Sequence, residues 1–199
     1  AASDVYKRQV VGGVMRTAGD WITNVILWLH DTLGVVGGFI FGFIYAPLTM
    51  TGMHHSLLPV DIQLIAAGGS FLFAIAACNN VAQGGAALAI ALKTKDTNKK
   101  ALASSAGITA ICGITEPALY GVTLQNKAAL IGSIVAGGVG GFFLGILGAR
   151  NFAGGSPGLL TIAAYIGEDT LKYFYTAIAG LVISVVVSFI VTFILYKED

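Results

Sequence analysis

Charged residues are scarce in this chain. Only 11% of its 199 residues are Asp, Glu, Lys or Arg, whereas soluble domains carry about 25%, and 56% are hydrophobic. The mean hydropathy is +0.82, and the net charge of +1 supplies no field that would attract nucleic acid. This composition excludes an ordinary cytosolic enzyme, a disordered tail and a nucleic-acid binder. It predicts a protein embedded in a lipid bilayer.

Cysteine is equally scarce. Cys78 and Cys112 lie in apolar stretches at unrelated spacing, which favours small buried side chains over a disulfide framework or a metal cluster. The adjacent pair His54 and His55 lacks metal-ligand spacing. The many glycines form no phosphate loop, nucleophile elbow or dinucleotide fingerprint. We therefore expect neither a metal nor a cofactor.

Three apolar, uncharged runs are long enough to cross a bilayer as helices, at residues 32–53, 128–149 and 173–195. Tyrosines and lysines flank the last run, as interfacial anchors do. Residues 21–29 are too short to cross, and their polar flanks favour an interfacial helix. The second run contains closely spaced glycines that favour tight helix packing: Gly137, Gly138, Gly140, Gly141 and Gly145.

Two other apolar stretches do not resemble simple spans. Residues 62–92 are interrupted by glycine pairs and by amide side chains, and residues 101–124 are interrupted by Pro117 directly after Glu116. Irregular backbone is tolerated at membrane depth only where protein or a wet cavity satisfies its polar groups. We therefore expect both stretches to be bent or re-entrant and to line a cavity.

The distribution of lysines predicts the topology. The lysine-rich loop at residues 93–100 and the C-terminus at Lys197 are both expected on the cytoplasmic side. The spans at 128–149 and 173–195 already supply an even number of crossings between them. Residues 101–124 must then enter and leave on one side as a hairpin, and a small interfacial piece near residues 152–166 does not change the count.

Glu116 is the sharpest candidate for a functional residue, because it is an acid at a helix break inside an apolar stretch. A neutral carboxylic acid bonded to freed backbone is the alternative. His54 or His55 is the next candidate. A looser polar set consists of Asp61, Asn79, Asn80 and Gln83. Members of this set either line the site or hold helices together by hydrogen bonds.

A carboxylate, imidazoles and amides without a cluster of cations suit an uncharged ligand with many hydroxyl groups, which both donate and accept hydrogen bonds. These groups predict a sugar transporter. A proton-coupled secondary transporter and a structural membrane subunit remain the alternatives.

Several motifs carry a family resemblance. The segments Gly113-Ile-Thr-Glu-Pro-Ala-Leu-Tyr-Gly-Val-Thr-Leu124, Thr51-Gly-Met-His-His55 and Asn79-Asn-Val-Ala-Gln-Gly84, with Leu102-Ala-Ser-Ser105 after the lysine loop, are present in this chain. Together they resemble the membrane-embedded IIC component of the phosphoenolpyruvate-dependent sugar phosphotransferase system, glucose superfamily. The likeness covers roughly residues 32–196, and it points to the sucrose, trehalose and β-glucoside branch without choosing among these sugars.

The resemblance implies a homodimer whose protomers each bind one sugar, move it inward and present a hydroxyl group to a IIB domain that carries a phosphocysteine. A IIA phosphocarrier and the N-terminal half of the IIC domain are further implied partners. Glu116 would act near the phosphorylated hydroxyl as the catalytic group. The sugar ligands would be His54, His55, Glu116, Thr51, Asn80, Gln83 and Asp61. Whether the chain itself counts as an enzyme stays open, because IIB performs the phosphoryl transfer.

The chain departs from a whole IIC domain, which has about ten spans. Residues 10–199 are expected to be the C-terminal, sugar-binding portion of this fold, with transmembrane helices and re-entrant hairpins. Neither cysteine lies in a basic, exposed setting suited to a phosphocysteine. Residues 1–9 are polar and differ abruptly from the rest of the chain, so they are expected to be a non-native leader. The expected location is the bacterial inner membrane.

Overall fold

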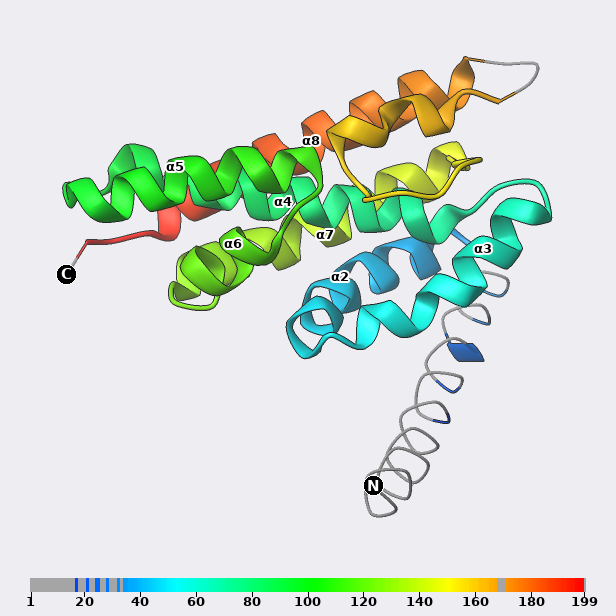
Figure 1. Cartoon of the computed structure of the whole chain (residues 1–199), viewed down its shortest axis with the longest axis horizontal. Coiled ribbons are helices and arrows are strands. Elements are labelled where there is room, and N and C mark those ends of the chain that lie inside the picture. Colours follow the sequence, from blue (N-terminus) through cyan, green and yellow to red (C-terminus); the bar gives the residue numbers. More distant parts are fainter. Residues whose placement is uncertain are drawn as a thin grey trace, which may run out of the picture.

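The computed structural model describes residues 34–167 and 171–198, with Thr17, Trp21, Asn24, Val25, Trp28 and Thr32. The expected leader at 1–9 and most of the expected interfacial helix at 21–29 lie outside the described residues. Three helices are long and apolar enough to cross a membrane: α4 (Phe71–Lys93), α7 (Lys127–Leu147) and α8 (Lys172–Leu195). They pack side by side (Figure 1). The described chain is an all-α polytopic membrane protein, as its sequence predicts.

The first expected span, residues 32–53, corresponds to one helix that ends in a sharp bend, and its crossing of the bilayer stays a prediction. Helix α2 (Val35–Thr51) ends at Gly52, whose φ of +73° lies in the left-handed region that glycine adopts without strain. The chain continues as a 3₁₀ helix, η1 (Met53–Leu57), and then as α3 (Leu58–Ala66). The segment Met53–Ala66 is bent by 117° from α2, which makes the pair a broken span or a re-entrant loop.

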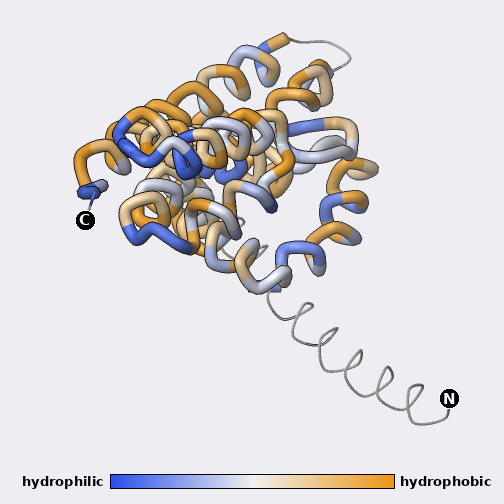
Figure 2. The backbone as a smooth tube through the Cα atoms, turned by 60° about the vertical axis from the view of Figure 1, so that its left-hand side comes forward, coloured by the Kyte–Doolittle hydropathy of each residue, from blue (hydrophilic) through white to orange (hydrophobic). Residues whose placement is uncertain are grey.

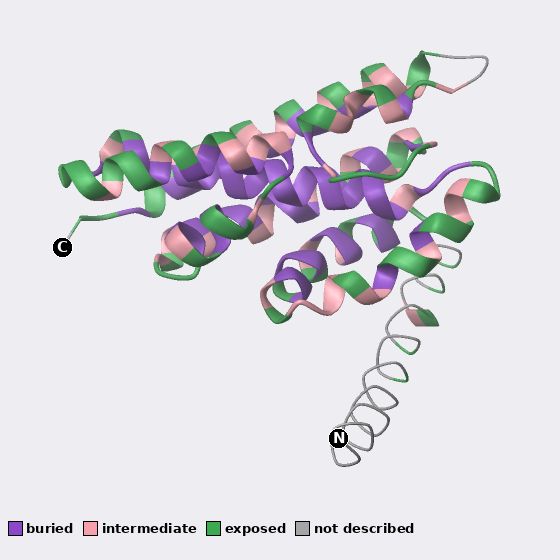
Figure 3. Ribbon diagram, in the orientation of Figure 1, coloured by how far each residue is buried: buried purple, intermediate pink, exposed green. Residues whose placement is uncertain are grey.

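The bend expected within residues 62–92 is present at Gly68 and Gly69, which both have positive φ. The other expected interruptions, at the amide side chains and at Gly84 and Gly85, are not breaks, because α4 is one continuous helix through them. Ser70 then caps α4. Within the membrane-length window of α4, 89% of residues are buried in protein, and α4 is purple along most of its length in Figure 3.

The hairpin expected at residues 101–124 is confirmed. Helix α5 (Thr97–Cys112) begins at an Asp96 cap and packs along α4. The chain then returns through α6 (Glu116–Ala118) and a π-helical turn, η2 (Leu119–Thr123) (Figure 1). We call the turn between the two arms, residues 113–115, the hairpin tip. Gly113 has a φ of +112°, so the tip depends on a backbone conformation that other residues rarely adopt.

Glycines bring α2 and α7 into backbone contact, which confirms the packing role predicted for the glycines of residues 137–145. A Cβ atom on Gly42 would lie 2.2 Å from the carbonyl oxygen of Gly137. A Cβ atom on Gly141 would lie 2.2 Å from the carbonyl oxygen of Gly38. This spacing is the small-xxx-small pattern of membrane helix pairs. The contact holds α2, which leads into the histidine-containing η1, against the helix bundle.

The connection from α7 to α8 passes back over the bundle. Asn151 and Ser70 form an isolated antiparallel bridge through N–H···O bonds of 2.8 and 3.0 Å. Residues 153–158, which we call the strap, come next. The 3₁₀ helix η3 (Leu159–Tyr165) then leads toward α8. The yellow loop in Figure 1 carries the strap from the end of α7 toward the end of α5.

The opposite end of the bundle is polar. Hydrophilic segments gather beside the C-terminus (Figure 2). There Glu198 accepts hydrogen bonds from Thr94 Oγ1 at 2.6 Å and from the Lys95 amide at 2.7 Å. The ammonium group of Lys99 lies 5.1 Å from the ring centre of the buried Tyr196. The C-terminal residues are therefore bonded to the turn between α4 and α5.

Candidate functional site

A cavity of about 330 Å³ lies where the broken and re-entrant segments meet. Its walls come from α2, η1, α3, the middle of α4, the hairpin tip and the strap. Segments with interrupted backbone thus surround the cavity, as the rule for irregular backbone at membrane depth requires.

Both histidines reach the cavity from η1. Neighbours on an α-helix point about 100° apart and rarely face one cavity together. In η1 the ring centres of His54 and His55 lie 4.0 Å apart with 36° between their planes, and both residues line the cavity. Tyr45 adds a third ring, 6.2 Å from His54 in an edge-on arrangement. Together the three rings form an aromatic wall with polar edges.

Glu116 reaches the cavity from the hairpin. Helix α5 stops at Gly113, and the Ile114 amide bonds back to the Thr109 carbonyl at 2.9 Å. Pro117 lies in the first turn of the returning arm, where its missing N–H costs nothing. The Glu116 carboxylate lies in this same turn, is exposed, and lines the cavity.

Asp61 and Asn80 also line the cavity, but each has a protein partner. Asp61 is 7% exposed and accepts a hydrogen bond from Ser70 Oγ. Asn80 is 6% exposed and donates its Nδ2 hydrogen to the Pro157 carbonyl at 2.7 Å. These two buried side chains are therefore tied to neighbouring segments.

Three of the sequence-predicted polar residues, Thr51, Asn79 and Gln83, lie outside this cavity. The Asn79 amide donates to the Ile75 carbonyl at 3.2 Å within α4. Thr51 is exposed, and its hydroxyl donates to the Leu48 carbonyl at 3.0 Å. Gln83 is 1% exposed inside the bundle, and neither its amide oxygen nor its amide nitrogen has a hydrogen-bond partner among the described residues.

Sequence reasoning missed Tyr45 and the strap residues Gly155, Ser156 and Pro157, which all line the cavity. The clustered glycines and proline of the strap are the same signal of irregular backbone that marked the hairpin. Tyr45 carries no such signal, because an aromatic residue in an apolar helix is ordinary.

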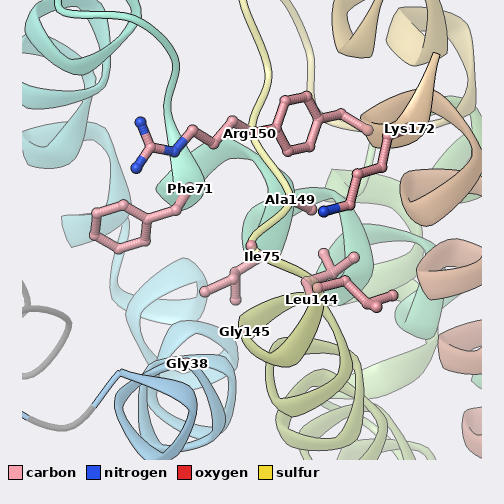
Figure 4. Close-up of a pocket in the computed structure, with 11 residues that line it drawn as sticks. Gly38, Phe71, Ile75, Leu144, Gly145, Ala149, Arg150 and Lys172 are labelled. Atoms are coloured by element: carbon pink, nitrogen blue, oxygen red, sulfur yellow. The ribbon is translucent and has the colours of Figure 1, made fainter. Parts of the chain in front are cut away.

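A second cavity, of about 300 Å³, lies beyond the strap at the ends of α4, α7 and α8. Arg150 and Lys172 line it together with apolar side chains, and none of its described lining residues is an acid. Figure 4 shows the guanidinium of Arg150 on the Phe71 side and the ammonium of Lys172 toward Ala149. No sequence-predicted site residue lies there. Its cations distinguish it from the first cavity, whose described lining contains neither Lys nor Arg.

Within the described parts of the chain, no three His, Cys, Asp or Glu side chains are grouped closely enough to hold a metal ion.

Comparison with known proteins gives a consistent result. The sequence profile of the family described as "Phosphotransferase system, EIIC" matches residues 9–137. A PTS system sucrose-specific EIIBC component of Staphylococcus xylosus is 42% identical over 164 residues, which are 80% of this chain and 34% of that protein. The corresponding protein of Vibrio alginolyticus is 40% identical over 96% of this chain and 40% of its own length.

A PTS system trehalose-specific EIIBC component of Bacillus subtilis (strain 168) is 34% identical, over 92% of this chain and 39% of its own length. The chain thus spans about two fifths or less of these three curated relatives. No solved structure matches it significantly. The family and the apolar helices place the protein in the bacterial inner membrane. Because the family profile covers more than half of the sequence, the chain belongs to the EIIC family of the sugar phosphotransferase system.

Proposed function

We propose that residues 10–199 form the C-terminal, sugar-binding portion of a IIC permease that binds an uncharged sugar in the cavity beside Glu116. One observation carries the proposal: three separate segments bring His54 and His55, Asn80 and Glu116 to a single cavity whose described lining has neither Lys nor Arg. Imidazole, amide and carboxylate groups match hydroxyl groups, which donate and accept at once. The cavity volume lies within the usual range for small-molecule sites.

The aromatic wall of Tyr45, His54 and His55 supports the same ligand class. A sugar ring has an apolar face of C–H groups and a polar rim, so a wall of rings with ring nitrogens at its edge suits both parts. Sucrose is the first sugar to test. Two relatives named as sucrose-specific are 42% and 40% identical, whereas a relative named as trehalose-specific is 34% identical.

We assign Glu116 the role of orienting the hydroxyl group that becomes phosphorylated and of accepting its proton. Phosphoryl transfer depends mainly on in-line positioning and charge stabilisation, so the acceptor's host needs little covalent chemistry of its own. The phosphoryl group would come from a phosphocysteine on a IIB domain, supplied in turn by IIA. Relatives named EIIBC and EIIBCA components carry such partners in their names.

The proposed assembly includes more than this chain. The turn at residues 93–100 and the C-terminus face the cytoplasm in our proposal, because lysines gather there. The N-terminal half of a IIC domain and a second protomer complete a homodimer. Thr51 and Gln83 remain proposed contributors to sugar binding in a conformation other than the one described.

The test uses the complete reading frame that contains this chain, expressed in cells without their own sugar transporters. Membranes receive phosphoenolpyruvate, soluble phosphocarriers, a IIB partner and labelled sucrose, trehalose or a β-glucoside. We expect phosphorylated product from one of these sugars. Uptake that follows a pH gradient without phosphoenolpyruvate would favour the proton-coupled alternative. Membranes with no sugar dependence of any kind would favour a structural subunit.

A further inference from the structure

We propose that the strap, residues 153–158, is the wall that positions the hairpin tip, and that Ser156 and Asn80 are the positioning residues that hold it there. This inference rests on the proposed function, since it concerns the same sugar site. Glu116 comes directly after the tip, so whatever fixes the tip also fixes the carboxylate.

The strap and the hairpin tip touch backbone to backbone. The Ser156 hydroxyl donates to the Gly113 carbonyl at 2.7 Å. A Cβ atom on Gly158 would lie 2.5 Å from the Gly113 Cα and 2.8 Å from the Cys112 carbonyl carbon, so no side chain fits between the two segments. One hydrogen bond and one close backbone approach therefore join the strap to the tip.

The strap is also bonded to the middle of α4. Asn80 is almost fully buried, and its amide group donates to the Pro157 carbonyl at 2.7 Å. The two residues are 77 positions apart in the sequence, so this bond joins segments that are distant along the chain.

The strap has a defined shape of its own. Thr161, in the first turn of η3, donates its hydroxyl hydrogen to the Ser156 carbonyl at 2.8 Å, and the Gly158 amide donates to the same hydroxyl at 3.4 Å. On its other side the strap adjoins the bridge between Asn151 and Ser70. A short segment held at both ends transmits the position of α4 to the tip.

These contacts place the strap between α4 and the Glu116 arm. Gly155 and Ser156 line the cavity, so the strap contributes small side chains to the wall that a sugar would touch. If the bond between Ser156 and Gly113 is lost, the tip can separate from the strap. The Glu116 carboxylate then loses its fixed distance from Asn80.

The experiment uses Cys112 as a native reporter, since it is half-buried and its backbone lies beneath Gly158. Membranes with the complete protein are treated with N-ethylmaleimide, and the alkylation rate of the Cys112 peptide is read by mass spectrometry. Cys78 is fully buried and reports background. We expect Ser156→Ala and Asn80→Ala each to raise the Cys112 rate by about five-fold, the factor that one hydrogen bond of typical net strength supplies.

Ser156→Thr keeps the hydroxyl group and is expected to restore the original rate. Ser105→Ala, an exposed serine on α5 whose hydroxyl bonds only within its own helix, is the matched control and should leave the rate unchanged. The kcat/KM of sugar phosphorylation should fall in Ser156→Ala and recover in Ser156→Thr. A hydroxyl-dependent recovery of both quantities is not expected from general misfolding.

Two results separate this inference from the proposed function. If sugar is phosphorylated but neither Ser156→Ala nor Asn80→Ala changes Cys112 alkylation, the strap does not position the tip and the inference is wrong. If no sugar is phosphorylated while both variants accelerate alkylation, the positioning role stands and the proposed sugar chemistry fails.

Discussion

At the scale of single residues, Glu116 should affect chemistry more than sugar binding. Glu116→Gln keeps the size and the hydrogen-bonding ability of the side chain but removes its capacity to accept a proton. We expect the phosphorylation kcat to fall about 100-fold, in the range typical of a lost general base, with a much smaller change in sugar affinity. Initial phosphorylation rates and equilibrium binding of labelled sugar, measured on the same membranes, test this.

The control is Glu198→Gln, the same substitution at the far end of the chain, which should leave both quantities unchanged. Equal losses of rate and affinity in Glu116→Gln would assign this residue to binding alone.

Asp61 should affect stability more than sugar affinity. Its carboxylate accepts the hydrogen bond of Ser70, and Ser70 pairs with Asn151 at the foot of the strap. We expect Asp61→Ala to destabilise the protein by about 1–3 kcal/mol, because the buried Ser70 hydroxyl would lose its partner. Ser70→Ala should have a similar effect, and the double variant should be less destabilised than the sum of the two. Thermal unfolding in detergent measures all three variants.

A contrary result would be an unchanged melting temperature in Asp61→Ala together with abolished sugar binding. Asp61 would then be a direct sugar ligand.

Residue chemistry is sufficient to select much of the cavity. Glu116, His54 and Asn80 stand out in the sequence because polar groups are costly in an apolar run, and they line one cavity. That rule does not distinguish a polar group facing a cavity from one facing another helix, which is why it also selects Gln83. The rule does not identify Tyr45, because nothing in the sequence distinguishes an aromatic side chain that lines a cavity from one that packs in the core.

At the scale of secondary-structure elements, the contact between α2 and α7 should tolerate no added methyl group. In Gly42→Ala the new Cβ would lie 2.2 Å from the Gly137 carbonyl oxygen, so the helices must separate. We expect a loss of about 1–3 kcal/mol, the usual cost of overpacking. We also expect weaker sugar binding, since α2 leads into the histidine turn. The melting temperature and the sugar Kd of the purified protein measure the two effects.

Gly154→Ala is the control, because a Cβ atom there would meet no atom within 4 Å. Equal behaviour of the two variants would mean that α2 does not depend on this glycine contact.

The elements also show why the sequence places a break where the structure has none. The glycines at 84 and 85 suggest a bend, yet α4 is continuous. There they allow close packing, since a Cβ atom on Gly84 would lie 2.8 Å from the Gly107 carbonyl oxygen and one on Gly85 would lie 2.5 Å from that of Val185. Gly52, at the end of the first expected span, does turn the chain. The sequence alone does not distinguish a glycine that allows close helix packing from a glycine that allows a turn. The neighbouring helices decide which role the glycine has.

At the scale of the whole molecule, the C-terminal contact should depend on pH. Hydrogen bonds from Thr94 and from the Lys95 amide hold the pKa of Glu198 below its ordinary value of 4.5. Because the folded-state pKa is lowered, the contact is fully formed above pH 4.5 and is lost as the pH falls through the lowered pKa. Hydrogen–deuterium exchange at Lys95, corrected for intrinsic exchange, should show protection that disappears on acidification.

Glu198→Gln removes the titrating group. In this variant the Lys95 amide should be weakly protected from exchange, and its protection should not change with pH in this range. If the natural protein shows the same flat profile, Glu198 does not hold the turn between α4 and α5.

The charge distribution predicted the polar end and the hairpin, because lysines and crossing parity act over the whole chain. It did not predict which helix would lie at the centre. That place belongs to α4, which packs against α2, α5, α7 and α8.

The burial of α4 bears on how the protein is made. Its hydropathy of 1.4 is lower than the 2.1 of α7 and the 2.8 of α8, and it carries Asn79, Asn80 and Gln83. Such a helix partitions weakly into lipid by itself. Yet the ribosome completes α4 before α7 and α8, the helices that cover it, have been synthesised. The nascent α4 must therefore be sheltered by the insertion machinery, or by segments already inserted, until α8 emerges.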